Sequence, residues 1–235
     1  MNTILICLVV ALCTVQIADV RGDSLNVLKA QLQKSKGDVN RIINDLTRSK
    51  NNLHYNLNNK LYNAKFPAME SINAMVNPAM EEVRSAVNAA KEAGKDADRC
   101  LETGRLALRE ISQTAFNAMD SCQSSALQAI VPVQNNMDAT IIVARQLNAE
   151  LDSIFPNCYT SNIIQMQSCI AIALGKSNIT IRSLQSTADA VKSSGDMAAN
   201  SAYSQGSSCF RDVVSSARPK IPYAVASARD CISNA

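Results

Sequence analysis

The feature that most constrains the fold is a row of apolar residues at heptad spacing near the N-terminus. Leucine or valine recurs at every seventh position from residue 25 to residue 53, and two more apolar residues occupy interleaved positions. This spacing predicts a long amphipathic helix. The interleaved row then fails at Ser35, Ser49 and Asn56, which favours a helix that packs in a bundle or on a partner chain over a self-sufficient coiled coil. The predicted interaction seam comprises Leu25, Leu28, Leu32, Val39, Ile42, Leu46 and Leu53.

Further apolar stripes with a helical period follow, through residues 101–126, 137–154 and 163–191. No stretch has the alternation of apolar and polar residues that a strand requires. The predicted fold class is therefore all-α, as an antiparallel helical bundle or an elongated helical hairpin with a long N-terminal amphipathic helix.

Proline and glycine predict where the helices begin and end. Two copies of Pro-Ala-Met-Glu, eleven residues apart, predict helix starts at Pro67 and Pro78. Helix ends are predicted near Pro132, at the turn Phe155-Pro156-Asn157, and at Ser193-Ser194-Gly195.

The first residues indicate export from the cell. An apolar run from Ile4 to Val15 is too short to span a membrane and is typical of a signal peptide, although no basic residue precedes it. Val20 and Gly22 lie three and one residues before a cleavage site ahead of Asp23. We therefore expect a signal peptide at 1–22, an amphipathic heptad-bearing region at 23–94 and a disulfide-braced helical domain at 95–235, in a secreted protein. An N-terminal core helix is the alternative interpretation of the apolar run.

Cleavage after residue 22 would remove two cysteines and leave six: Cys100, Cys122, Cys158, Cys169, Cys209 and Cys231. An even set in an oxidising compartment predicts three disulfides that brace the helices. Free thiols and a metal cluster are the alternatives, but no Cys-x-x-Cys or Cys/His spacing typical of zinc occurs in the chain.

The cysteine spacing limits the pairing. The interval from Cys100 to Cys122 equals that from Cys209 to Cys231, and on a helix it corresponds to about 33 Å of rise and about 40° of rotation. Antiparallel helices would join Cys100 to Cys231 and Cys122 to Cys209, whereas parallel helices would join Cys100 to Cys209 and Cys122 to Cys231. A local loop bridge between Cys158 and Cys169 fits both arrangements. Six cysteines allow about fifteen connectivities, so the pairing stays open.

Composition and charge argue against several function classes. The net charge of +3 is too small to predict nucleic-acid binding, and no second apolar stretch is long enough to anchor the mature chain in a membrane. Residues 23–66 carry eight Lys/Arg against three Asp, which indicates a solvated helix face or, alternatively, a surface for an anionic partner. The absence of Trp and the 4% of aromatic residues favour closely packed helices over an aromatic-rich pocket.

Catalytic and cofactor chemistry is not predicted. The chain has a single histidine, His54, so neither a Ser-His-Asp triad nor a two-histidine metal site can be assembled. Glu81 and Glu82 would lie in a first helical turn and favour its positive end. We therefore expect no enzyme activity and no cofactor. Asn178 begins the only N-glycosylation sequon, which would be exposed by a helix break at Gly175 and would lie beside the apolar stripe on a continuous helix.

The cysteine-bearing helices carry a family resemblance. Their features are Ala/Ser/Asn-rich composition and widely spaced cysteines, in Arg99-Cys100-Leu101-Glu102, Asp120-Ser121-Cys122 and Ser208-Cys209-Phe210. On these features, residues 96–235 resemble insect secreted helical proteins of the TsetseEP-domain type. The resemblance implies an extracellular arthropod protein of gut, haemolymph or saliva, and it does not imply a biochemical role. Residues 23–94 fall outside it.

Three functions follow as hypotheses. The first is a secreted non-enzymatic interaction protein of an arthropod fluid, which engages an extracellular protein partner, including host or immune proteins. The second is a carrier of lipids or other hydrophobic ligands, because amphipathic helices can enclose apolar cargo. The third is a structural coat protein that self-associates through the seam of the N-terminal helix.

Overall fold

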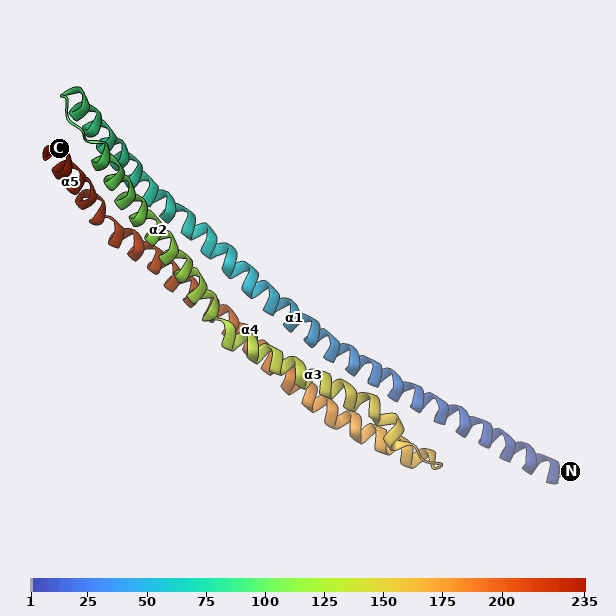
Figure 1. Cartoon of the computed structure of the whole chain (residues 1–235). Coiled ribbons are helices and arrows are strands. Elements are labelled where there is room, and N and C mark those ends of the chain that lie inside the picture. The colour runs from blue at the N-terminus through green and yellow to red at the C-terminus, as the bar shows by residue number, and fades with distance from the viewer. Residues whose placement is uncertain (1) are drawn as a thin grey trace. The chain divides into compact units, whose positions relative to one another are not determined.

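The computed structural model describes the backbone of residues 2–235 and the side chains of residues 24–235. It contains five α-helices and no strand in this range, so the all-α prediction is confirmed (Figure 1). The side chains of the predicted signal peptide lie outside the described residues, and the signal peptide stays a prediction. Among the described residues, no helix has a stretch both long and apolar enough for a membrane span. The helices are α1 (Asn2–Glu92), α2 (Asp98–Gln128), α3 (Val131–Cys158), α4 (Ile163–Ala217) and α5 (Lys220–Ser233).

The chain divides into two compact units. Unit 1 comprises the residues up to Asn51 and Val133–Ser194, and unit 2 comprises Asn52–Pro132 and Gly195–Ala235. Both α1 and α4 contribute to each unit. The units therefore group the residues differently from the expected division between residues 94 and 95.

Unit 1 is built from α1, α3 and the first part of α4. Lys36 pairs with Asp152 at 2.5 Å, and Lys50 pairs with Asp138 at 2.6 Å. From the first pair to the second, the residue number rises along α1 and falls along α3, so these two helices are antiparallel. By contrast, α4 runs parallel to α1, because Gln167 donates a hydrogen bond to Ser24 and, eleven residues further along both helices, Asn178 accepts one from Ser35.

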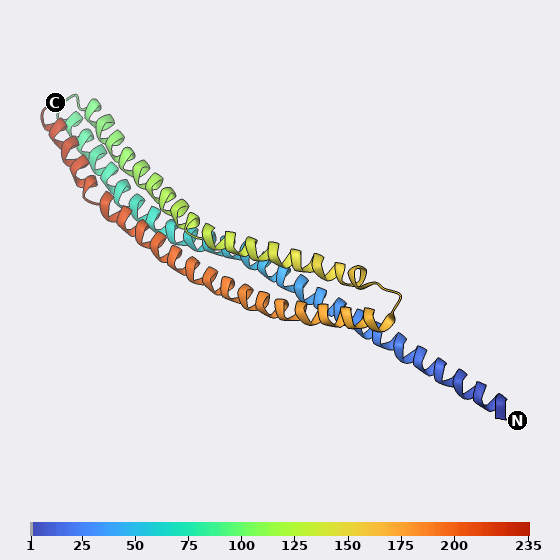
Figure 2. The ribbon, with the colours of Figure 1, turned by 90° about the horizontal axis from the view of Figure 1, so that it is seen from below.

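Unit 2 is built from three helical segments that lie side by side (Figure 2). They are the second part of α1, the helix α2, and the end of α4 followed by α5. Lys65 pairs with Asp120 of α2, and Arg229 of α5 pairs with Glu82 of α1. An apolar cluster closes one end of the unit, with Val87, Ala90 and Ala97 buried and Leu101 and Ile232 packed on them. Each helix therefore contacts both of the others, as in a three-helix bundle.

The predicted helix starts at Pro67 and Pro78 are wrong, since α1 runs uninterrupted through both prolines. Each proline leaves the carbonyl four residues earlier without its helical partner. Those carbonyls belong to Asn63 and Ala74, which are exposed, so water can replace the lost hydrogen bond. The eleven-residue spacing of the prolines corresponds to three helical turns, which keeps both on the solvent face. Helix α1 ends instead beside Gly94, whose φ of +81° suits glycine.

The predicted helix end at Ser193-Ser194-Gly195 is also wrong, because α4 continues to Ala217. Ser194 Oγ bonds to the carbonyl of Ala190, four residues earlier, and Gly195 is buried. The turn predicted at Phe155-Pro156-Asn157 lies later, at residues 159–162, since α3 includes Pro156 and ends at Cys158. The helix end near Pro132 lies close to the predicted position, and a short turn at residues 218–219 separates α4 from α5.

The predicted interaction seam is mostly part of the core. Leu32, Val39, Ile42, Leu46 and Leu53 are buried by the chain's own helices, and only Leu25 and Leu28 stay half-exposed. Ser35, where the apolar row fails, is 4% exposed, and its hydroxyl is satisfied by Asn178. Of the alternatives that the half-apolar seam left open, the packing of this helix in a bundle is the one present in the structure. The five buried residues are therefore closed to an external partner in this fold.

Two glycines test how tightly the helices pack. A Cβ on Gly104 would lie 3.0 Å from both Ala228 Cβ and Val83 Cγ1, whereas nothing lies within 4 Å of a Cβ on Gly175. Because overpacking outweighs the gain in helix propensity, we expect Gly104→Ala to lower the free energy of unfolding by about 1 kcal/mol. Gly175→Ala should raise it by about 0.5–1 kcal/mol. Urea unfolding followed by circular dichroism measures both, and the same sign for both variants would contradict this packing.

Candidate interaction surfaces

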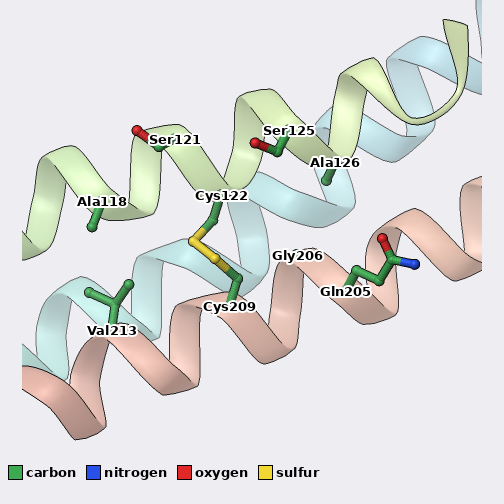
Figure 3. Close-up of a pocket in the computed structure, with 9 residues that line it drawn as sticks. All are labelled: Ala118, Ser121, Cys122, Ser125, Ala126, Gln205, Gly206, Cys209 and Val213. Carbon is green, nitrogen blue, oxygen red and sulfur yellow. A yellow bond between two sulfur atoms is a disulfide. The ribbon is translucent and has the colours of Figure 1, made fainter.

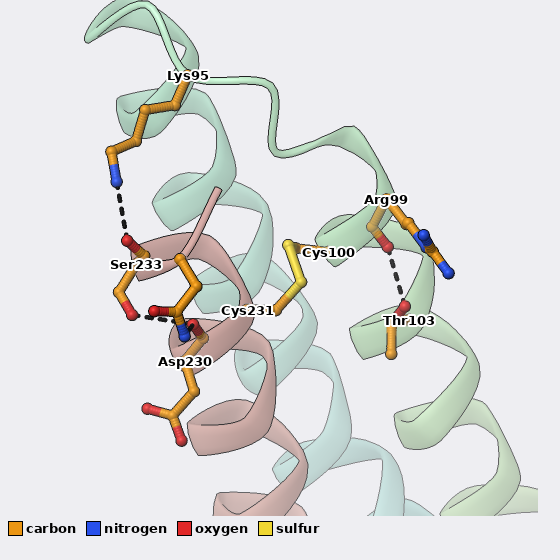
Figure 4. Close-up of a disulfide and its surroundings, with 8 residues drawn as sticks. Lys95, Arg99, Cys100, Thr103, Asp230, Cys231 and Ser233 are labelled. Atoms are coloured by element: carbon orange, nitrogen blue, oxygen red, sulfur yellow. Dashed lines mark hydrogen bonds between the residues drawn. A yellow bond between two sulfur atoms is a disulfide. The ribbon is translucent and has the colours of Figure 1, made fainter.

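Two disulfides clamp unit 2 along its length. Cys122 of α2 bonds to Cys209 of α4 with Cα atoms 5.8 Å apart (Figure 3), and Cys100 of α2 bonds to Cys231 of α5 with Cα atoms 5.6 Å apart (Figure 4). Of the two arrangements that the spacing left open, this is the antiparallel one. In unit 1, Cys158 at the end of α3 bonds to Cys169 in α4, the local bridge across the turn.

The end of α5 is held by polar contacts beside Cys231. Lys95 Nζ, in the connection between α1 and α2, donates to the carbonyl of Ser233 at 3.0 Å, as Figure 4 shows. On α2, Thr103 Oγ1 bonds to the carbonyl of Arg99. These contacts satisfy backbone groups, so they hold the helix ends and provide no reactive group.

An open groove lies between α2 and α4 around the Cys122–Cys209 bridge. It has two hollows of about 510 Å³ and about 280 Å³, which share Ala118, Cys209 and Val213. Figure 3 shows the residues that line the larger of these two hollows. Most of the other lining residues are small or polar, such as Ser121, Ser125 and Gly206. The groove therefore offers few large side chains on which a partner could anchor, and no aromatic residue lines it.

An exposed aromatic stripe runs along α1 in unit 2. Tyr55, Tyr62 and Phe66 are 65%, 60% and 53% exposed, and at about 100° per residue they fall within about 40° of one another around the helix axis. Asn59, between them on the same face, is exposed and uncharged. The chain has only nine aromatic residues, five Tyr and four Phe, so a third of them lie on this stripe. We call Tyr55, Tyr62 and Phe66 the aromatic stripe.

The basic excess of residues 23–66 is partly neutralised within the chain. Lys36, Lys50 and Lys65 pair with aspartates of α2 and α3, and Arg41 pairs with Asp38. The remaining basic residues of this segment form no ion pair in the described part of the chain, and they are Lys29, Lys34, Arg48 and Lys60. Half of the predicted basic surface therefore serves contacts within the protein.

The sequon lies on a continuous helix. Helix α4 passes through Gly175 without a break, and Asn178 is exposed. Its Oδ1 accepts a hydrogen bond from Ser35 Oγ at 3.0 Å. Glycosylation of Asn178 stays a prediction.

The described side chains do not assemble into a recognisable catalytic or metal site. His54 is exposed on α1, and no cluster of three metal-ligating side chains occurs among residues 24–235. In the part of the chain that the structure describes, one exposed pair on α2 has shifted pKa values: the hydrogen bond from Arg105 lowers the pKa of Glu102, and the same bond raises the pKa of Arg105. Glu81 and Glu82, expected in a first helical turn, lie near the end of α1, where Glu82 pairs with Arg229.

Comparison with protein-family models, curated proteins and solved structures finds no match to this chain.

The sequence reasoning missed the aromatic stripe, although its signal was present. Tyr55, Tyr62 and Phe66 follow helical spacing, seven and then four residues apart. They lie on a different face of the helix from the Leu46 and Leu53 row, which drew attention because heptad apolar residues are the usual sign of association. Of the two rows, the aromatic one stays accessible in the structure.

Proposed function

We propose that this chain is a secreted, non-catalytic binding protein that engages an extracellular protein partner through the aromatic stripe. The observation that carries the proposal is the exposure of Tyr55, Tyr62 and Phe66 on one face of α1. Exposed aromatic residues are enriched at the centres of protein interfaces, because their large rings gain much from leaving water.

The construction of unit 2 supports this role. Helix α1 packs through Leu57, Leu61 and Ile72 into a core whose other helices are cross-linked by two disulfides. The aromatic stripe therefore lies on a helix that is already fixed before binding, which lowers the loss of conformational entropy on association. Three disulfides in all support an oxidising environment outside the cell. On this proposal the protein acts in an arthropod fluid such as saliva, gut contents or haemolymph.

Capture from the native fluid tests the proposal. The purified, oxidised protein and a variant with Tyr55→Ser, Tyr62→Ser and Phe66→Ser are immobilised, and bound proteins are identified by mass spectrometry. A partner held by this surface should be retained by the wild-type protein and should bind the triple variant at least about a hundredfold more weakly, since loss of each anchoring ring costs about 1–2 kcal/mol.

The matched control changes equally exposed apolar residues in unit 1. Ile142, Ile172 and Ile179 are 54%, 59% and 70% exposed, and their replacement by serine should leave partner binding unchanged. Equal retention of every captured protein by both triple variants would place binding elsewhere on the molecule.

A further inference from the structure

Unit 2 has a second groove, between α1 and α4, with an apolar wall. Its volume is about 490 Å³, within the range of roughly 300–1,000 Å³ of small-molecule sites. The small residues Ala64, Pro67 and Ala68 of α1 form one side, and Phe210 and Val214 of α4 form the other. The groove therefore has the volume of a small-molecule site and apolar residues on both of its sides.

Two arginines without partners stand along the same groove. Arg211 and Arg218 both line it and are exposed, and neither forms an ion pair within the described range of the chain. Asp212, the acidic neighbour of Arg211, lines the groove between α2 and α4 instead. The groove between α1 and α4 thus has an uncompensated positive charge beside its apolar wall, which favours an anionic ligand.

A buried hydroxyl in the groove also lacks a partner. Ser207 lines the groove, and its Oγ is inaccessible to solvent and makes no hydrogen bond. Other helical serines of this chain donate to the carbonyl four residues earlier, as Ser71, Ser112, Ser121 and Ser194 do. A buried polar group left unpaired destabilises the protein unless something else satisfies it.

We propose that the groove between α1 and α4 in unit 2 binds a single anionic amphiphile, a molecule with an acidic head group and one apolar chain. The chain lies along Ala64, Ala68 and Val214, the head group is held by Arg211 and Arg218, and rotation of the Ser207 side chain brings its Oγ within hydrogen-bond reach of a polar atom of the ligand. A free fatty acid has this chemistry. The site is distinct from the aromatic stripe, so it does not depend on the proposed protein partner.

Calorimetric titration of the full, oxidised protein with laurate, below its micellar concentration, tests the site. Wild-type protein should bind one laurate, and the variant with Arg211→Gln and Arg218→Gln should bind it about tenfold or more weakly, because two charge-assisted contacts are lost. The uncharged alcohol of the same chain length should bind the two proteins equally. The matched control, Arg99→Gln with Arg109→Gln, changes two exposed arginines of α2 that also lack ion pairs and should bind laurate as the wild type does.

Ser207→Ala gives a second test, in which laurate affinity and the melting temperature of the ligand-free protein are measured together, so that a loss of folding can be recognised. It should weaken laurate binding several-fold while the ligand-free protein keeps or raises its melting temperature, since an unpaired buried hydroxyl is removed. No laurate binding by the wild type, or equal loss in the groove and control variants, overturns the proposal. So does binding only to phosphatidylserine vesicles that is indifferent to Arg211 and Arg218, because that result indicates general attraction to a charged surface. Laurate binding that survives in the aromatic-stripe variant separates this site from the proposed protein-binding surface.

Discussion

Replacing Cys122 and Cys209 together by alanine is expected to lower the free energy of unfolding by about 4 kcal/mol. The bridge joins residues 87 positions apart, and a cross-link over so long a loop removes much of the conformational freedom of the unfolded chain. Because Cys122 is buried, alanine avoids leaving a polar group in the core. Urea unfolding of the purified variant, with the other bridges kept oxidised, measures the loss.

The bridge between Cys158 and Cys169 provides the comparison. Its residues are only 11 positions apart, so the same double replacement there should cost about 3 kcal/mol or less. A larger loss at Cys158 and Cys169 than at Cys122 and Cys209 would contradict the loop-length argument, and no loss at either pair would show that the bridges do not form in the purified protein.

Leu46→Ala is expected to destabilise the protein by about 3 kcal/mol, because it leaves a cavity in the core of unit 1. Leu46 is fully buried although it belongs to the heptad seam. Tyr62→Ala, on the aromatic stripe, should change the free energy of unfolding by no more than about 0.5 kcal/mol, since the Tyr62 side chain is 60% exposed. Thermal and urea unfolding of the two variants provide the comparison.

Together, Leu46→Ala and Tyr62→Ala test which face of α1 packs in the core and which face is free to bind a partner. If the seam served an external partner and not the core, Leu46→Ala would barely alter the isolated protein and would instead abolish partner binding. If the stripe were part of the core, Tyr62→Ala would be the destabilising variant.

The arrangement of the cysteines was largely predictable because helices convert sequence distance into length. Equal intervals from Cys100 to Cys122 and from Cys209 to Cys231 give equal rises, so both bridges can form at once between two antiparallel helices. The direction of the helices was not predictable from the spacing, since a parallel pair meets the same condition. The pairing in the structure, Cys100 with Cys231 and Cys122 with Cys209, shows that α2 runs antiparallel to the end of α4 and α5.

Helix ends were harder to predict than helix faces. Pro67, Pro78 and Gly195 are local signals, and each costs a helix only a few kcal/mol or less. Buried residues on both sides of each site, such as Leu61 and Ile72 around Pro67, favour continuation by a larger amount. Tertiary packing therefore overrides the local preference, and a single sequence does not reveal that packing.

The sites were the least predictable part. Ser35 interrupts the apolar seam, and the sequence gives no sign of its partner. In the structure its buried hydroxyl donates a hydrogen bond to Asn178, 143 positions away. The aromatic stripe could have been found from its spacing, whereas the groove between α1 and α4 could not. That groove depends on which side of α1 the end of α4 occupies, and no local pattern specifies this.

The covalent connectivity determines what a protease can release. The turns at residues 129–130, 159–162 and 218–219 each fall inside at least one loop closed by a disulfide. A single cut at any of these turns yields two fragments that stay tied together through sulfur. The connection at residues 93–97 lies before Cys100 and is enclosed by none of the three bridges. No disulfide among residues 24–235 joins α1 to the other helices, so digestion there would leave the aromatic stripe attached to the remainder by noncovalent contacts only.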